Sequence, residues 1–284
     1  MVRMTWIGIF LFALSPAGAF ASDEKASPQE QFSALAESFE KQMTEFQEGF
    51  AELKTDEERE RHWMENMPEP EAVAGKMIAL AKAHQSEVGF QVVEWVLSNR
   101  VEGEHRETAM EMLKEHHLGN EEVGSLLYGM AYDVDPTATA ILESIAANGK
   151  SEKLRGVAHF ALAKHLLGRC EMARYVAAAS EEELEGMKGY FGEAGLASLK
   201  NLDAVQVTAR AESLLDKVST EFASVPAQRG GTLGDAAKRD LFEIRNLAIG
   251  KAAPEIEGED IDGVTFKLSD YRGKVIFLDF WGDW

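Results

Sequence analysis

The chain has 284 residues, of which 45% are hydrophobic and 27% are charged, and its 49 acidic and 29 basic residues give a net charge of −20. The length suits one large or two ordinary domains. This negative charge argues against binding to the phosphate backbone of nucleic acids, and it disfavours electrostatic adhesion to anionic lipid. The single cysteine excludes an internal disulfide framework and a cysteine-rich metal site.

Residues 1–21 are typical of a secretory signal peptide. Arg3 supplies the positive end, residues 6–14 form a short apolar core, and Ala19-Phe20-Ala21 is a small-residue cleavage site. The alternative is a membrane anchor, but the apolar run has roughly half the length that a spanning helix needs. We therefore predict a mature protein that begins at Ser22, has no membrane span and is exported to the periplasm or another extracytoplasmic compartment.

An amphipathic helix is predicted from residue 32 to residue 53. Its apolar side chains recur every three or four positions and form one stripe, while glutamates occupy the other faces. The stripe consists of Phe32, Leu35, Phe39, Met43, Phe46, Phe50 and Leu53. Because three heptads are marginal as an isolated coiled coil, we expect this helix to pack on its neighbours rather than to form a dimer.

A series of short amphipathic helices is predicted after Pro70, separated by glycine, proline and asparagine. Their expected ranges are 71–84, 87–99, 104–117, 121–131, 136–147, 152–167 and 171–178, and two longer helices are expected at 194–223 and 233–248. Paired helices of this size resemble the hairpin arrays of tetratricopeptide proteins, but the sequence has no fixed period. We expect residues 22–249 to form an irregular helical domain, with no strand before residue 225.

The histidines of this region do not have the spacing of a metal site. His116 and His117 are adjacent and would point about 100° apart on a helix. His159 and His165 are six residues apart, which is not the spacing that places two ligands on one helical face. We interpret these histidines as surface or core residues, and we expect no metal ion and no cofactor.

Cys170 is a second residue that could carry chemistry. Arg169 and Arg174 lie nearby in the sequence and could lower the pKa of its thiol. A lone cysteine in an exported protein is nevertheless more often a small buried hydrophobic residue than a nucleophile. We therefore interpret the helical region as a scaffold or a surface for a protein partner.

The pattern changes from helix to strand after Gly250. Asp262-Gly263 predicts a hairpin turn between segments 255–261 and 264–268. Val275–Phe280 is a nearly continuous apolar run, as in a strand that is buried on both faces of a sheet. Asp279 interrupts this run, and a carboxylate in a dry position is expected to have a function.

Residues 250–284 resemble the start of the exported thioredoxin-like proteins, which include the membrane- and periplasm-associated thiol–disulfide oxidoreductases and lie close to the peroxiredoxin-like redoxins. The shared elements, in order, are Gly250-Lys251-Ala252-Ala253-Pro254, Asp262-Gly263, Leu268-Ser269-Asp270-Tyr271-Arg272-Gly273-Lys274 and Asp279-Phe280-Trp281-x-x-Trp284. The resemblance implies a mainly α chain followed by the first strands of a truncated α/β thioredoxin-like domain. In this family Cys-x-x-Cys follows the last tryptophan.

The resemblance also implies roles for three residues. Asp279 matches the buried acid that moves protons for the second cysteine, and Trp281 and Trp284 match the aromatic residues that flank the active-site loop. The implied reaction is attack by a thiolate on a protein disulfide, through a mixed disulfide that the second cysteine resolves. The implied partners are therefore protein thiols and disulfides.

Three alternatives remain open from the sequence. A peroxiredoxin-like antioxidant enzyme would be expected to carry a loop rich in proline and threonine before its cysteine, and residues 280–284 do not resemble one. The chain could instead be a non-catalytic helical binding module, or its tail a strand-rich extension without a redox role. The sequence as given lacks the Cys-x-x-Cys on which the redox function depends.

The chain stops one residue before the expected first cysteine. If a stop codon follows Trp284, we expect it to be TGA, which arises from a cysteine codon by one base change and can also encode selenocysteine. An incomplete sequence would explain the same endpoint.

Overall fold

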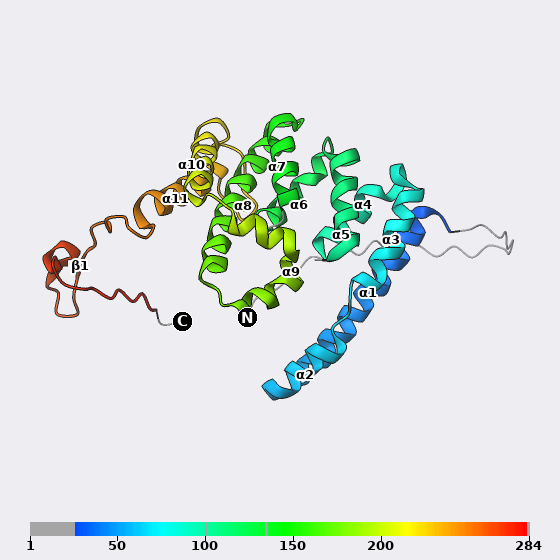
Figure 1. The fold of residues 1–284 in the computed structure, drawn as a ribbon, viewed down its shortest axis with the longest axis horizontal. Coiled ribbons are helices and arrows are strands. Elements are labelled where there is room, and N and C mark those ends of the chain that lie inside the picture. Colours follow the sequence, from blue (N-terminus) through cyan, green and yellow to red (C-terminus); the bar gives the residue numbers. More distant parts are fainter. Residues whose placement is uncertain (1–25, 100, 134–135, 283–284) are drawn as a thin grey trace.

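The computed structural model describes residues 26–99, 101–133 and 136–282, and the predicted signal peptide lies outside them. The described part contains eleven α-helices and one two-stranded antiparallel sheet, which confirms the expected mainly α fold. Figure 1 shows the helices following one another across the molecule, with the sheet at one end. No helix within the described ranges combines the length and apolar character needed to cross a bilayer.

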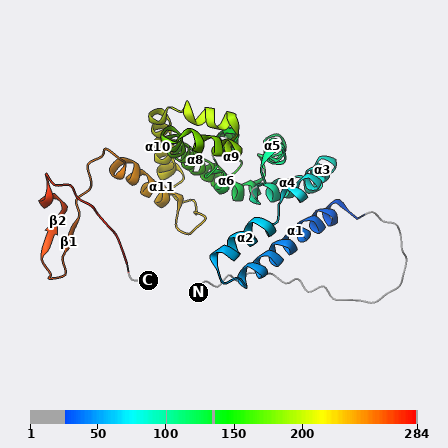
Figure 2. The same ribbon diagram turned by 60° about the horizontal axis from the view of Figure 1, so that its bottom comes forward.

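Helices α1 (Pro28–Ala51) and α2 (Asp56–Asn66) form a hairpin that projects from the other helices in both ribbon views (Figures 1 and 2). Each begins with a capping box, which Ser27 forms for α1 and Thr55 for α2. Phe39 is buried against Trp95 of α4 (Gln85–Ser98), with ring centroids 5.3 Å apart. The prediction that this helix packs on its neighbours is therefore confirmed.

Helix α2 was not predicted, because it is highly charged and has no buried residue that would form an apolar stripe. It is held to α1 by aromatic contacts. The His62 ring stacks on Phe46 with centroids 5.0 Å apart, and its Nε2 atom lies 3.1 Å from the Phe46 carbonyl oxygen.

Helices α3 (Glu71–Ala83), α4 (Gln85–Ser98) and α5 (Gly103–Met112) lie close to their predicted ranges, and a π-helical turn (Leu113–His117) extends α5. Their inward side chains are mostly alanine, valine and methionine. Small side chains let helices approach closely, which explains why these short helices form a dense core.

Helices α6 (Gly124–Met130) and α7 (Pro136–Asn148) lead into α8 (Glu152–Ala178), the longest helix. The expected break between 152–167 and 171–178 is wrong, because α8 continues through Gly168. A glycine inside a helix costs about 1 kcal/mol relative to alanine. Burial of Leu166 and Cys170 on either side outweighs that cost.

Helices α9 (Glu181–Lys200) and α10 (Ala204–Glu221) replace the single helix predicted for residues 194–223. The chain turns at residues 201–203, where the Asp203 side chain accepts hydrogen bonds from the backbone N–H groups of Val205 and Gln206. Ser180 and Glu183 form a capping box at the start of α9, whose first turn carries the acidic residues 181–183. The local caps therefore decided a boundary that the apolar pattern did not reveal.

Helix α11 (Leu233–Phe242) begins at the predicted residue 233, and its N-cap is Thr232, whose hydroxyl accepts a hydrogen bond from the Asp235 N–H. A π-helical turn (Glu243–Leu247) follows it. Lys164 of α8 and Asp240 of α11 form an ion pair with 3.2 Å between Nζ and Oδ2. One continuous hydrophobic core reaches from Phe39 of α1 to Leu241 of α11.

Strands β1 (Glu257–Glu259) and β2 (Thr265–Lys267) form the predicted hairpin, in which Gly258 pairs with Phe266. Gly263 has a φ of +77°, the left-handed conformation that the turn requires. Within the described ranges both strands follow Pro254, which confirms that no strand precedes residue 225.

The strand expected at Val275–Phe280 is not formed, and this prediction is wrong for the chain as given. A strand needs a neighbour for its backbone hydrogen bonds. The described residues supply only the β1–β2 hairpin, in which each strand pairs with the other.

Candidate functional site

The C-terminal segment builds a small apolar pocket of about 200 Å³ against the hairpin. Six side chains line it, namely Ile256, Phe266, Leu268, Tyr271, Ile276 and Leu278. Ile276 and Leu278 are 39% and 49% exposed, whereas Val275 and Phe277 are almost fully exposed. The segment therefore alternates like a strand that has one face on the hairpin and the other in solvent.

Asp279 lies on the solvent side of this alternation, together with Val275 and Phe277, and it is exposed. No described residue covers that face, and the expectation that Asp279 lies in a dry position stays a prediction. Trp281 is 84% exposed, and Trp284 lies outside the described residues. The roles that the family resemblance implies for Asp279, Trp281 and Trp284 stay predictions.

Cys170 is 2% exposed in the middle of α8, as predicted for a small buried hydrophobic residue. Its Sγ atom lies 3.8 Å from the carbonyl oxygen of Ala204 and 3.7 Å from the hydroxyl of Thr208. Burial between α8 and α10 keeps disulfide reagents from this thiol.

We expect the Cys170 thiol to react with Ellman's reagent at least roughly a hundredfold more slowly in the folded protein than in denaturant, because reaction requires the packed helices to open. The released chromophore measures both rates. Reaction of one thiol per chain at the same rate with and without denaturant would contradict the buried position.

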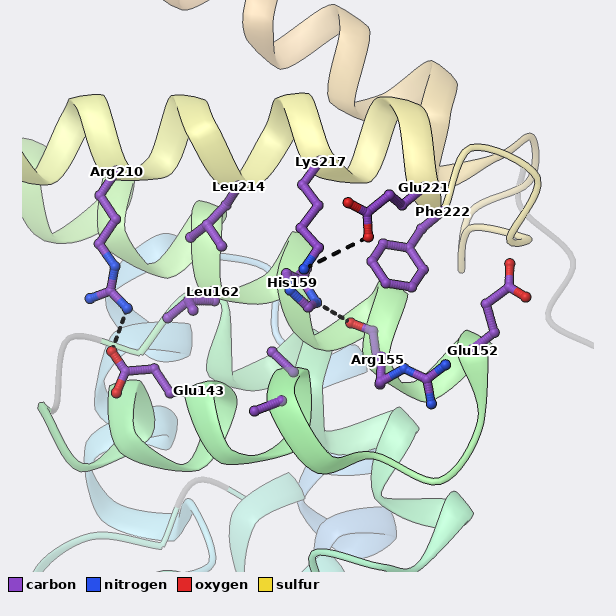
Figure 3. Close-up of a pocket in the computed structure, with 12 residues that line it drawn as sticks. Glu143, Glu152, Arg155, His159, Leu162, Arg210, Leu214, Lys217, Glu221 and Phe222 are labelled. Carbon is purple, nitrogen blue, oxygen red and sulfur yellow. Dashed lines mark hydrogen bonds and ion pairs between the residues drawn. The ribbon is translucent and has the colours of Figure 1, made fainter.

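A larger groove of about 810 Å³ lies between α7, α8 and α10 (Figure 3), and the sequence analysis did not identify it. Its lining combines three acidic and three basic side chains with apolar ones. The charged residues are Glu143, Glu152, Arg155, Arg210, Lys217 and Glu221. They come from helices that are separated in the sequence, so periodicity within one helix could not have revealed the groove.

His159 lines this groove and is 7% exposed. Its Nδ1 atom lies 2.8 Å from the carbonyl oxygen of Arg155, so Nδ1 carries the proton and donates it. The ring packs on Phe222, with centroids 5.1 Å apart. Burial lowers the pKa of His159, and the nearby charge of Lys217 acts in the same direction.

The basic residues of the groove differ in their partners. Arg210 forms an ion pair with Glu143, with 2.5 Å between Nη2 and Oε1. Lys217 and Glu221 are 3.8 Å apart, at the outer limit of an ion pair. Arg155 donates to the backbone oxygen of Gly149 at 2.8 Å.

The other histidines are accounted for by packing, as interpreted from the sequence. His165 is fully buried, with its Nε2 atom 2.8 Å from the Thr139 hydroxyl. His117 packs on Phe90, and burial lowers the pKa of its imidazole. In the part of the chain that the structure describes, no three histidine, cysteine, aspartate or glutamate side chains lie close enough to hold a metal ion.

Comparison with known proteins finds similarity over a short stretch only. The chain is 47% identical over 38 residues to thiol-disulfide oxidoreductase ResA of Geobacillus thermodenitrificans, which covers 13% of this chain and 22% of that protein. It is 50% identical over 38 residues to ResA of Geobacillus kaustophilus. It is 45% identical over 55 residues to ResA of Bacillus anthracis, which covers 19% of this chain and 32% of that protein.

The chain therefore spans between 22% and 32% of the length of these curated relatives. No protein-family model matches the chain. No solved structure matches it either. The similarity is thus segmental.

Proposed function

We propose that the chain belongs to an exported thiol–disulfide oxidoreductase, in which residues 22–249 form a helical domain and residues 250–284 begin a thioredoxin-like domain. The observation that carries this proposal is the ordered motif series of residues 250–284, and the segmental similarity with the ResA proteins supports it. The β1–β2 hairpin at Asp262-Gly263 supports it.

The proposed reaction needs a nucleophilic thiolate and a second cysteine. The thiolate attacks one sulfur of a substrate disulfide, which forms a mixed disulfide and releases the other sulfur as a thiolate. The second cysteine then attacks the mixed disulfide and releases the reduced substrate. Cys170 is the single cysteine of the chain and is buried, so it does not fill either role.

Completion of the thioredoxin-like domain would change the surroundings of Asp279. Neighbouring strands would cover the face that Val275 and Phe277 now expose to solvent. A covered Asp279 would then be placed to exchange protons with the resolving cysteine. Trp281 and Trp284 would flank the active-site loop.

The experiment starts from the nucleotide sequence after the Trp284 codon and compares residues 22–284 with the protein extended by that sequence. We expect the extended protein to reduce insulin at least about tenfold faster than residues 22–284, which should show only the background rate. The measurement is the turbidity of the released insulin B chain.

The matched controls are the extended protein with the two new cysteines replaced by serine, which should be inactive, and Cys170→Ser, which should be fully active. Absence of an open frame encoding Cys-x-x-Cys, or an inactive extended protein, would contradict the proposal. Reduction of peroxide without reduction of insulin would favour the peroxiredoxin-like alternative.

A second candidate function is a helical protein-binding module without catalysis. The groove between α7, α8 and α10 favours it, because this groove is independent of the C-terminal segment.

A further inference from the structure

The hairpin of α1 and α2, residues 28–67, is called the arm here and projects from the other helices in both ribbon views (Figures 1 and 2). None of the described residues of the continuous core comes from α2. The inner face of α2 packs on α1 instead, where the Trp63 ring meets Phe46 edge-on with centroids 5.6 Å apart. Gly49 makes room for His62, because a Cβ at Gly49 would lie 2.9 Å from the His62 ring. The arm is therefore a packed two-helix unit.

The outer face of α2 carries exposed apolar side chains. Trp63, Met64 and Met67 are 53%, 72% and 37% exposed. Together with Glu60 they occupy positions i, i+3, i+4 and i+7, which lie on one face of a helix. A single exposed apolar side chain is ordinary on a protein surface, but a group of adjacent ones indicates an interaction site. We call this group, Trp63, Met64 and Met67, the apolar patch.

The side chains of the apolar patch are of the kinds that bind other proteins. Tryptophan is enriched among the residues that contribute most to the affinity of interfaces. Methionine is flexible and polarizable, and it is common on surfaces that accept varied apolar partners. Apolar side chains three and four positions apart can also pack along a second helix of the same pattern.

Negative charge surrounds the apolar patch. The arm carries 11 acidic and four basic side chains. The acidic residues are Glu30, Glu37, Glu40, Glu45, Glu48, Glu52, Asp56, Glu57, Glu58, Glu60 and Glu65, and the basic residues are Lys41, Lys54, Arg59 and Arg61. Glu57 and Glu60 precede Met64 by seven and four positions, so they lie on or beside the same face. Both are exposed, and neither forms an ion pair among the described residues.

This charge distinguishes between the possible occupants of the apolar patch. A second copy of this chain would bring the same negative arm against the first, and the two sets of carboxylates would repel each other. Anionic lipid would be repelled for the same reason. A protein segment with lysine or arginine beside an apolar stripe would bury the patch and also pair its cations with the carboxylates.

We propose that the arm binds a basic amphipathic helix of a partner protein. The apolar stripe of the partner packs on Trp63, Met64 and Met67, and its lysine or arginine side chains reach Glu57 and Glu60. The site shares no residue with segment 250–284 and goes beyond the proposed redox function.

The test uses two fluorescently labelled peptides of leucine and lysine with identical length and composition. In the first, leucine recurs every three or four positions, and in the second the order is scrambled so that a helix would have no apolar face. Fluorescence anisotropy measures binding to residues 22–284. We expect the first peptide to bind at least about tenfold more tightly, because only this peptide presents an apolar stripe. Higher salt should weaken the binding.

Two substitutions on the outer face of α2 should weaken binding of the first peptide. Met64→Ala shortens the apolar patch and Glu60→Lys reverses a charge beside it, and the double variant should bind at least about tenfold more weakly. The matched controls are Val205→Ala, which removes an exposed apolar side chain from α10, and Glu171→Lys, which reverses an exposed charge on α8. Each control should bind within about twofold of the parent. Thermal unfolding reports whether all variants are folded.

Methyl NMR spectra of the protein labelled at its methionine methyl groups locate the bound peptide. The signals of Met64 and Met67, assigned with Met64→Leu and Met67→Leu, should shift when the first peptide binds. The signal of Met130, which is 4% exposed on α6, should not shift.

Several results would overturn the proposal. Equal affinity for the two peptides, parental affinity in the folded double variant, equal weakening in the controls, or no binding at millimolar concentration would each do so. Self-association that the double variant abolishes would make a second copy the occupant, and binding to phosphatidylcholine vesicles that it abolishes would make a membrane the occupant. None of these results affects the insulin assay, so a failure here is distinguishable from a failure of the proposed redox function.

Discussion

Leu215→Ala should lower the free energy of unfolding by about 2–5 kcal/mol. Leu215 is completely buried on α10, which packs along α8 and α11 at the centre of the core. Removal of its side chain loses the transfer free energy of the buried carbons and leaves a cavity that the surrounding helices fill only partly. Urea denaturation monitored by circular dichroism measures the change.

Val205→Ala is the matched control on the same helix. Val205 is 82% exposed, so the substitution removes no buried area and should change stability by less than about 0.5 kcal/mol. Equal effects of the two substitutions would contradict the packing of α10 on α8.

Gly234→Ala should destabilise the protein by roughly 1–3 kcal/mol, although alanine is the better helix former. Gly234 lies in the first turn of α11, where an added Cβ would lie 2.8 Å from the Cα and the carbonyl oxygen of Ala223. These are backbone atoms, and the N–H of Gly234 bonds to that same oxygen at 3.3 Å. The clash is therefore not relieved by a side-chain movement.

Gly186→Ala tests the opposite case within α9. Apart from its chain neighbours and the nearby backbone of its own helix, no atom lies within 4 Å of an added Cβ at Gly186, so only the helix propensity changes. We expect this substitution to stabilise the protein by about 0.5–1 kcal/mol. A gain in stability from both alanines would show that α11 does not approach Ala223 as closely as the structure has it.

Local signals in the sequence determined most helices and the hairpin. The apolar stripe of α1, the cap at Thr232 and the turn at Asp262-Gly263 each depend on residues within a few positions of one another. Such interactions act on the chain before it folds, and they can therefore be predicted without knowledge of the rest of the structure. Helix α2 was missed because it is stabilised by contacts of Phe46 with His62 and Trp63 rather than by an apolar stripe.

Tertiary structure determined the secondary structure of segments for which the local sequence signals conflict or are absent. Helix α8 continues through Gly168 because its flanks are buried, and Val275–Phe280 does not become a strand because no described segment pairs with it. The two candidate sites, residues 250–284 and the groove between α7, α8 and α10, differ in the same respect. The motif series of residues 250–284 is a linear pattern, so the sequence alone indicated it.

The groove around His159 could not be read from the sequence in this way. His159 comes from α8, and Lys217, which lines the same groove, comes from α10, more than fifty residues later in the chain. Only the packing of α10 on α8 brings these groups together, and that packing is driven by non-directional burial of side chains such as Leu215. A sequence specifies which residues are buried by such packing, but the distances between charged groups on different helices follow only from the folded arrangement.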